Sequence, residues 1–106
     1  MILGVYVKQP AEIETLSVDW SNRILQSGYV IGSVDVKIFD QEGTEKTSEM
    51  LEGSPSAAGN SALFTVKGGT SGKKYFARIR VTLTKEGAPS LVQEEDLPIH
   101  VFQAGS

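Results

Sequence analysis

The segment from Tyr75 to Thr84 constrains the fold more than any other part of the chain. Its residues alternate between two sets, an apolar set at Tyr75, Ala77, Ile79, Val81 and Leu83 and a second set at Phe76, Arg78, Arg80, Thr82 and Thr84. Successive side chains of a strand point to opposite faces, so this pattern predicts a long strand with one buried and one solvent face. A half-buried strand of this kind is typical of an antiparallel sheet that is covered on one side.

Shorter alternating segments recur along the chain. They predict strands at residues 5–8, 14–20, 33–40, 61–67 and 97–101, and a weaker strand at 47–52. Turn residues are predicted at 40–43, 68–72 and 85–89, and a loop at 53–59. The acidic triplet 94–96 predicts a bulge or loop before the last strand, and Ser21 could cap a single helical turn at 22–26.

About seven strands with frequent turn signals, and no helix long enough for a crossover, exclude parallel βαβ units. We therefore predict an all-β fold, a two-sheet antiparallel Ig-like or fibronectin-like β-sandwich of about seven strands in a single domain, residues 1–106. Trp20 and Tyr75 would lie in its core. The Cys-Trp-Cys spacing of antibody domains is absent, and a small barrel is the competing architecture.

Composition excludes several functional classes. The 106 residues include no cysteine, so disulfides, thiolate metal sites and a cysteine nucleophile are excluded. The net charge of −3 argues against nucleic acid as a partner, because nucleic-acid-binding proteins usually carry a basic excess. No apolar stretch approaches the roughly 20 residues that span a bilayer. The start of the sequence lacks the basic and apolar regions of a signal peptide, so neither a membrane nor secretion is expected.

The glycine-rich stretch from Gly68 to Lys74 bears only a partial likeness to a phosphate-binding loop. Its glycine spacing is wrong, and a strand rather than a helix is predicted to follow it. We interpret it as a turn between strands.

Three other features are better explained by structure than by chemistry. His100, the only histidine, lies between Ile99 and Val101 and is predicted to face solvent, without the partners that zinc or a general base needs. The acidic triplet lacks the spacing of a calcium loop. Trp20 shares a predicted face with aliphatic residues, so we expect it in the core and not as a sugar-stacking platform. No catalytic residue, metal or cofactor is predicted.

One constellation points to a partner surface. In the predicted sandwich, the strands that start at Ser33, Tyr75 and Leu97 are neighbours, with the Tyr75 strand in the middle and antiparallel to both others. We expect three outward-facing aromatic side chains at one shared end of this sheet, namely Phe39, Phe76 and Phe102. Such an apolar patch usually marks a site of protein contact.

A polar rim is expected around the patch, formed by Asp35, Lys37, Arg78, Arg80 and His100. Alternatively, the chain ends or a loop could cover the rings, or a shifted register could scatter them. The residues predicted to form a partner interface are Phe39, Phe76, Phe102, Arg78 and Arg80.

From Val7 to Val101 the sequence resembles a family of small phage and prophage structural proteins, described as fiber-tail adaptor or Ig-like tail proteins. The residues that carry the resemblance are Lys8-Gln9-Pro10-Ala11-Glu12, Val18-Asp19-Trp20-Ser21, Gly28 with Ile31 and Ser33, Gly72-Lys73-Lys74-Tyr75, and Leu97-Pro98-Ile99-His100-Val101. The resemblance implies a short tail or connector component without catalytic residues, made in the bacterial host cytoplasm and carried in the virion tail.

Two functions follow as hypotheses. The first is a non-enzymatic phage structural or assembly module, which docks to other tail and virion proteins or to itself as a ring oligomer. The second is an Ig-like ligand- or carbohydrate-binding module that uses Trp20, Tyr29 or Tyr6 as a stacking platform. A small hydrolase is disfavoured, because no acid, base and nucleophile converge in the sequence.

Overall fold

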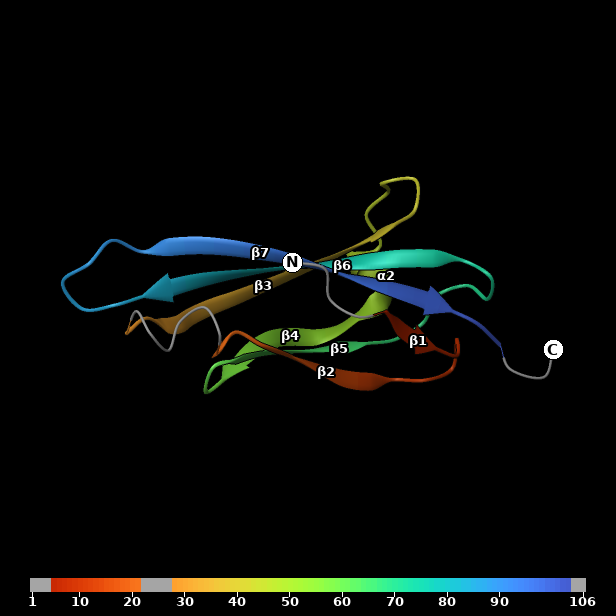
Figure 1. Ribbon diagram of the computed structural model, residues 1–106. Coiled ribbons are helices and arrows are strands. Elements are labelled where there is room, and N and C mark those ends of the chain that lie inside the picture. Colours follow the sequence, from red (N-terminus) through yellow and green to blue (C-terminus); the bar gives the residue numbers. More distant parts are fainter. Residues whose placement is uncertain (1–4, 22–27, 104–106) are drawn as a thin grey trace.

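The computed structural model describes residues 5–21 and 28–103, which form two sheets packed face to face (Figure 1). Its elements are β1 (Tyr6–Lys8), β2 (Glu14–Asp19), β3 (Val30–Asp40), α2 (Thr47–Met50), β4 (Leu51–Ala58), β5 (Ser61–Val66), β6 (Lys74–Thr84) and β7 (Leu91–Val101). The predicted all-β sandwich is confirmed, with seven strands in the described ranges. The predicted helical turn at 22–26 lies outside the described residues.

The larger sheet has the strand order β1-β7-β6-β3, and the smaller sheet has the order β2-β5-β4. The predicted neighbours of β6 are confirmed, since β6 pairs antiparallel with both β3 and β7. The arrangement of β7-β6-β3 against β2-β5-β4 matches the two sheets of an immunoglobulin domain. The expectation of purely antiparallel sheets is wrong in one place, because β1 runs parallel to β7.

Two predicted segments between β3 and β5 are wrong. A short helix, α2, replaces most of the strand predicted at 47–52, and β4 replaces the loop predicted at 53–59. The helix is held by tertiary contacts, since the Thr47 hydroxyl accepts the Ile38 N–H at 3.0 Å and Met50 is buried. In β4, Gly53 and Pro55 fall where pairing with β5 shifts register, and strands tolerate both residues there.

The bulge or loop predicted at the acidic triplet is also wrong, because β7 runs through it without a register shift. Glu94 lies directly opposite Arg80, and Asp96 lies opposite Arg78. Opposite charges across neighbouring strands stabilise their pairing. Glu95, the middle residue, points inward and is only 5% exposed.

The core is formed by alternate side chains of both sheets. Its members include Val36, Ile38, Ala62, Phe64, Val66, Ile79, Val81, Leu83, Ile99 and Val101. Trp20 is 1% exposed and donates its indole N–H to the Gln93 side-chain oxygen at 3.1 Å. The predicted core position of Trp20 is therefore confirmed.

Two buried polar groups fasten the end of the sandwich at which β6 begins. The Tyr75 hydroxyl oxygen accepts the Thr70 N–H at 3.0 Å, which corresponds to the tyrosine corner of immunoglobulin folds. The Lys8 ammonium group donates to the carbonyls of Gln9 and Gly68, each at 2.6 Å. Burial lowers the pKa of Lys8. The bond from Lys8 to Gly68 ties the first strand to the connection between β5 and β6.

The described chain is elongated, with extents of 54 × 24 × 23 Å. Its radius of gyration is 14.7 Å, against about 13 Å for an average domain of this length. The strands β3, β6 and β7 have 11 residues each, whereas β2, β4 and β5 have six to eight. The β6–β7 hairpin consequently projects beyond the smaller sheet (Figure 1), and the larger sheet presents a long outer face.

A pair of glycine substitutions tests the packing at the fastened end. Gly69 has φ +92°, and a Cβ there would lie 2.6 Å from Val101 Cγ2, in the core. Gly72 has a similar φ of +85°, but a Cβ there would meet no atom within 4 Å. Both alanine variants incur backbone strain, and only Gly69→Ala also overpacks the core. We expect Gly69→Ala to lower the free energy of unfolding by about 1–3 kcal/mol more than Gly72→Ala, as measured by urea denaturation. Equal losses would contradict this packing.

Candidate partner-binding surface

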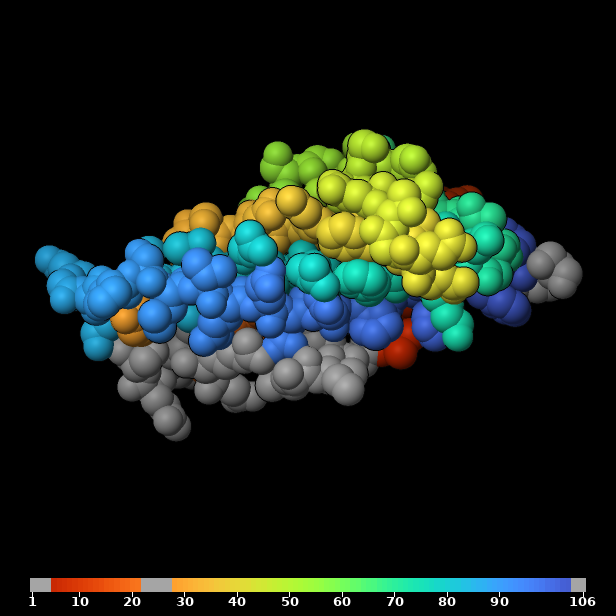
Figure 2. Space-filling model, turned by 90° about the horizontal axis from the view of Figure 1, so that it is seen from above, coloured from red at the N-terminus to blue at the C-terminus, as the bar shows by residue number. Residues whose placement is uncertain are grey.

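The outer face of the larger sheet carries the predicted interface residues. Figure 2 looks onto this face, where β3 (orange), β6 (blue-green) and β7 (blue) lie side by side. The pairing register arranges its outward side chains in rows across the strands. From the start of β6 these rows are Lys74–His100, Phe39–Phe76–Pro98, Lys37–Arg78–Asp96, Asp35–Arg80–Glu94 and Ser33–Thr82–Val92.

An aromatic pair lies near one end of this face. The rings of Phe39 and Phe76 stack with their centroids 5.2 Å apart and their planes inclined by 24°. The Arg78 guanidinium carbon lies 5.5 Å from the first centroid and 5.4 Å from the second. Stacking and cation–π contacts both hold the rings in one orientation. The structure thus brings together three of the five predicted interface residues.

Phe102 lies apart from this pair. The register places Pro98 beside Phe76, and Phe102 follows four residues later, just beyond the end of β7. Its side chain is 59% exposed. It borders a separate hollow of about 300 Å³. The three phenylalanines accordingly form two apolar spots at the same end of the sheet, not one continuous patch.

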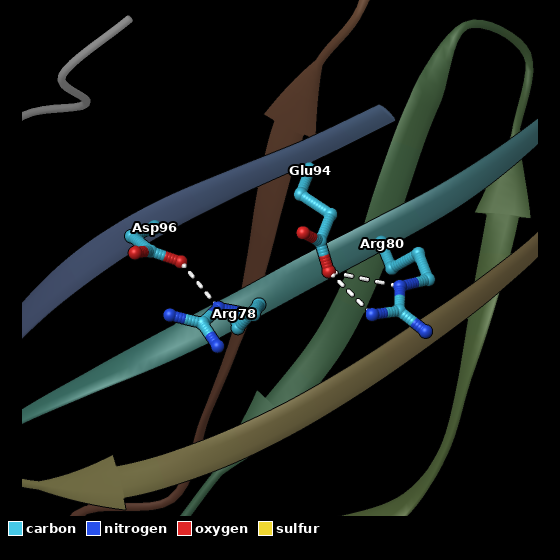
Figure 3. Close-up of polar contacts among 4 residues, drawn as sticks. All are labelled: Arg78, Arg80, Glu94 and Asp96. Carbon is cyan, nitrogen blue, oxygen red and sulfur yellow. Dashed lines mark hydrogen bonds and ion pairs between the residues drawn. The ribbon is translucent and has the colours of Figure 1, made fainter. Parts of the chain in front are cut away.

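The arginines of the predicted rim are engaged within the chain (Figure 3). Arg78 Nε lies 3.2 Å from Asp96 Oδ1, and Arg80 Nη2 lies 2.8 Å from Glu94 Oε2. The hydrogen bond from Arg78 to Asp96, together with their charge attraction, raises the pKa of Arg78. Partly exposed pairs of this kind contribute little to stability, but they fix the direction of each side chain.

Sequence reasoning missed this charge ladder because it assigned the acidic triplet to a loop. The spacing of the charged residues in the sequence nevertheless indicated that these two segments pair. Arg78 and Arg80 share one face of their strand, and Glu94 and Asp96 have the same two-residue spacing. Two complementary pairs with equal spacing favour two paired strands over a strand and a loop.

The residues of the alternative ligand-binding hypothesis do not form an open stacking platform. Trp20 is buried in the core. Tyr29 donates its hydroxyl to the Pro89 carbonyl at 3.0 Å, and the Lys85 ammonium lies over its ring at 5.8 Å from the centroid. The third candidate, Tyr6, has a buried hydroxyl oxygen.

The glycine-rich stretch and His100, which the sequence analysis considered for chemistry, lie in a connection between strands and on the outer face of a sheet. The stretch from Gly68 to Gly72 connects β5 to β6, and β6 follows it in place of a helix. His100 lies on the outer face opposite Lys74. Within residues 5–21 and 28–103, no group of three or more His, Asp or Glu side chains could hold a metal ion. No helix in the same ranges is long and apolar enough to cross a membrane.

A groove of about 450 Å³ runs between β1 and β2. It is lined by Val5, Tyr6, Leu16, Ser17, Val18, Asp19 and Leu97. The pKa of Tyr6 is raised to about 12, mainly by burial of its hydroxyl and to a smaller extent by its contact with the nearby Glu14 carboxylate. The contact lies outside ordinary hydrogen-bond geometry, so burial is the stronger reason for the shift.

The raised pKa of Tyr6 predicts a pH dependence of stability. An unfolded tyrosine ionises near pH 10, whereas the folded chain keeps the proton of Tyr6 until about pH 12. The folded state binds more protons in this window, so its stability falls as the pH rises from 10 to 12. We expect the stability of the wild type relative to Tyr6→Phe to fall by on the order of 1 kcal/mol across this window. Guanidine unfolding of both chains at several pH values measures this difference, and a constant difference would contradict the burial of the hydroxyl.

Comparison with known proteins identifies a family that this sequence matches. The model of a protein family described as "Podophage GP4 fiber-tail adaptor protein gp77" matches residues 8–90, which is more than half of the chain. The matched span contains the stacked Phe39 and Phe76 and ends before β7. No match was found among curated proteins.

Proposed function

Since this chain belongs to the podophage GP4 fiber-tail adaptor family, we propose that it is a non-enzymatic structural adaptor in a phage tail. As such an adaptor it would act in the virion, as a single sandwich domain, and it would bind other tail proteins.

The proposed docking surface is the outer face of β3, β6 and β7 at the end where β6 begins. The stacked Phe39–Phe76 pair is the observation that supports this assignment. Both rings are partly exposed, they stack on each other, and the Arg78 guanidinium lies over both of them. Rigid aromatic side chains next to arginine are typical of the residues that contribute most to protein interfaces.

Arg80 and Phe102 extend this surface in two directions. Arg80, paired with Glu94, continues the charged rows toward the hairpin. Phe102 adds a second apolar spot near the end of β7. Full burial of a phenylalanine contributes roughly 1.5–3 kcal/mol, before the cost of association is subtracted. A surface with three such rings supports weak binding of one copy, and several copies in a tail would bind firmly through avidity.

Self-association is the competing form of the same function. Light scattering behind a sizing column, over a hundredfold range of concentration, separates the two. A monomer at every concentration favours docking to a different tail protein, and a defined ring would identify a second copy as the partner.

The substitution Phe76→Asp tests the docking surface. It removes one ring of the stack and places a carboxylate beside the other ring, so we expect a folded monomer that no longer binds its tail partners. Thr82→Asp is the matched control, because it places the same charge on the outer face of the same strand at three rows' distance. The measurement is co-purification with co-expressed neighbouring tail proteins, with circular dichroism to verify folding.

We expect recovery of the partner complex to fall by at least about tenfold for Phe76→Asp, which corresponds to the lost burial of one ring. Thr82→Asp should retain wild-type recovery. Equal recovery of both variants, or an unfolded Phe76→Asp chain, would contradict the assignment of this surface.

A further inference from the structure

Two hollows flank a pair of lysines at the end of the domain where β7 ends, on the right in Figure 1. The first hollow measures about 300 Å³ and is lined by Val7, Gly72, Lys73, Lys74, His100, Val101 and Phe102. The second measures about 200 Å³ and is lined by Asp40, Gln41, Glu42, Lys46, Thr70, Lys73, Lys74 and Tyr75. Lys73 and Lys74 border both hollows and form a cationic ridge between them.

The charge of this ridge is available to a partner. Lys73 and Lys74 are both exposed, and neither forms an ion pair with a described residue. This distinguishes them from Arg78 and Arg80, whose charges are matched by acidic side chains on β7. Asp40 and Glu42 line the second hollow, but no ion pair joins either of them to Lys73 or Lys74, and no acidic residue lines the first hollow. On the side of the first hollow, the ridge therefore offers two positive charges that no ion pair with a described residue engages.

The first hollow adds apolar surface beside this charge. Val7 and Phe102 are each 59% exposed and stand on its border. The volume of this hollow lies at the lower limit of small-molecule pockets, so it suits one large apolar side chain.

The backbone around the first hollow is already fixed. The Gly72 N–H donates to the Val101 carbonyl at 2.9 Å, and the Val101 N–H donates to the Lys73 carbonyl at 3.0 Å. Phe102 donates its N–H to the Lys8 carbonyl at 2.9 Å. A site held by such bonds loses little conformational entropy when a ligand binds.

We propose that this end of the domain binds an acidic extended segment of a neighbouring tail protein. One apolar side chain of the segment enters the hollow between Val7 and Phe102, and its carboxylates meet Lys73 and Lys74. The inference rests on the proposed adaptor function and names the chemistry of the partner. Charge complementarity selects an acidic segment, and the single hollow selects one apolar anchor within it.

Three synthetic decapeptides test the proposal by fluorescence polarisation with the isolated chain. The first carries one leucine among glutamates and serines, the second replaces the leucine with serine, and the third replaces every glutamate with lysine. We expect the first peptide to bind at least roughly tenfold more tightly than either of the others, and to lose affinity as salt is added. Equal binding of the three peptides, or none by the first, would overturn the proposal.

A matched pair of double variants locates the site. Lys73→Gln with Lys74→Gln removes two charges from the ridge, and Lys67→Gln with Lys85→Gln removes two charges elsewhere. We expect the first double variant to weaken binding of the acidic leucine peptide by about fivefold or more, and the second to leave it unchanged. Equal effects of the two double variants would overturn the site.

The outcome separates this inference from the adaptor role. A chain that binds the peptide but does not associate with tail proteins contradicts the adaptor role, and it supports the site for an acidic segment without a tail protein as its source. A chain that associates with tail proteins at wild-type level after loss of both ridge lysines contradicts the acidic-segment inference alone.

Discussion

The register of β6 between β3 and β7 is the constraint on which the other features depend. Every inward residue of this strand is buried against the smaller sheet, and each outward residue from Phe76 to Thr82 has a defined neighbour on both sides. A register slip of one residue would exchange the inward and outward faces of the strand. It would place the Arg78 and Arg80 side chains in the core, and burial of these charges is prohibitively costly. Because that slip is excluded, the same register fixes the Phe39–Phe76 stack and both arginine–carboxylate pairs. The surface is thus a direct consequence of the core.

The sequence predicts those parts of the molecule in which this two-residue period is visible. It correctly predicted the neighbours of β6 and the meeting of Phe39 with Phe76. It did not predict β7 through its acidic residues, because Glu94 and Asp96 are typical of strands only when basic partners lie opposite them. The segments α2 and β4 were missed for a related reason, since Met50 and Thr47 obtain their conformation from contacts with distant strands. The separation of Phe102 from Phe76 depends on the register that the β6–β7 hairpin sets, which no local pattern indicates.

The proposed docking surface and the proposed site for an acidic segment lie at the same end of an elongated domain. The aromatic pair lies under Arg78, which in turn pairs with Asp96, and contacts that restrict side chains before binding reduce the entropy lost on binding. Beside it, the ridge of Lys73 and Lys74 provides charge that no described residue matches. Apolar contact supplies binding energy, whereas charge complementarity supplies selectivity and speed of encounter. The proposed adaptor would use both properties, one to select its partner and the other to stay bound.

Hydroxyl-radical footprinting of the chain, free in solution and within assembled tails, tests the central claim most directly. The method reports the solvent exposure of individual side chains, so it compares the outer face of β3, β6 and β7 with the smaller sheet in one experiment. The docking account predicts that Phe39, Phe76 and Phe102 become protected on assembly, while exposed residues of β2 and β4 keep their labelling. Protection confined to β2 and β4, with unchanged labelling of the three phenylalanines, would contradict it.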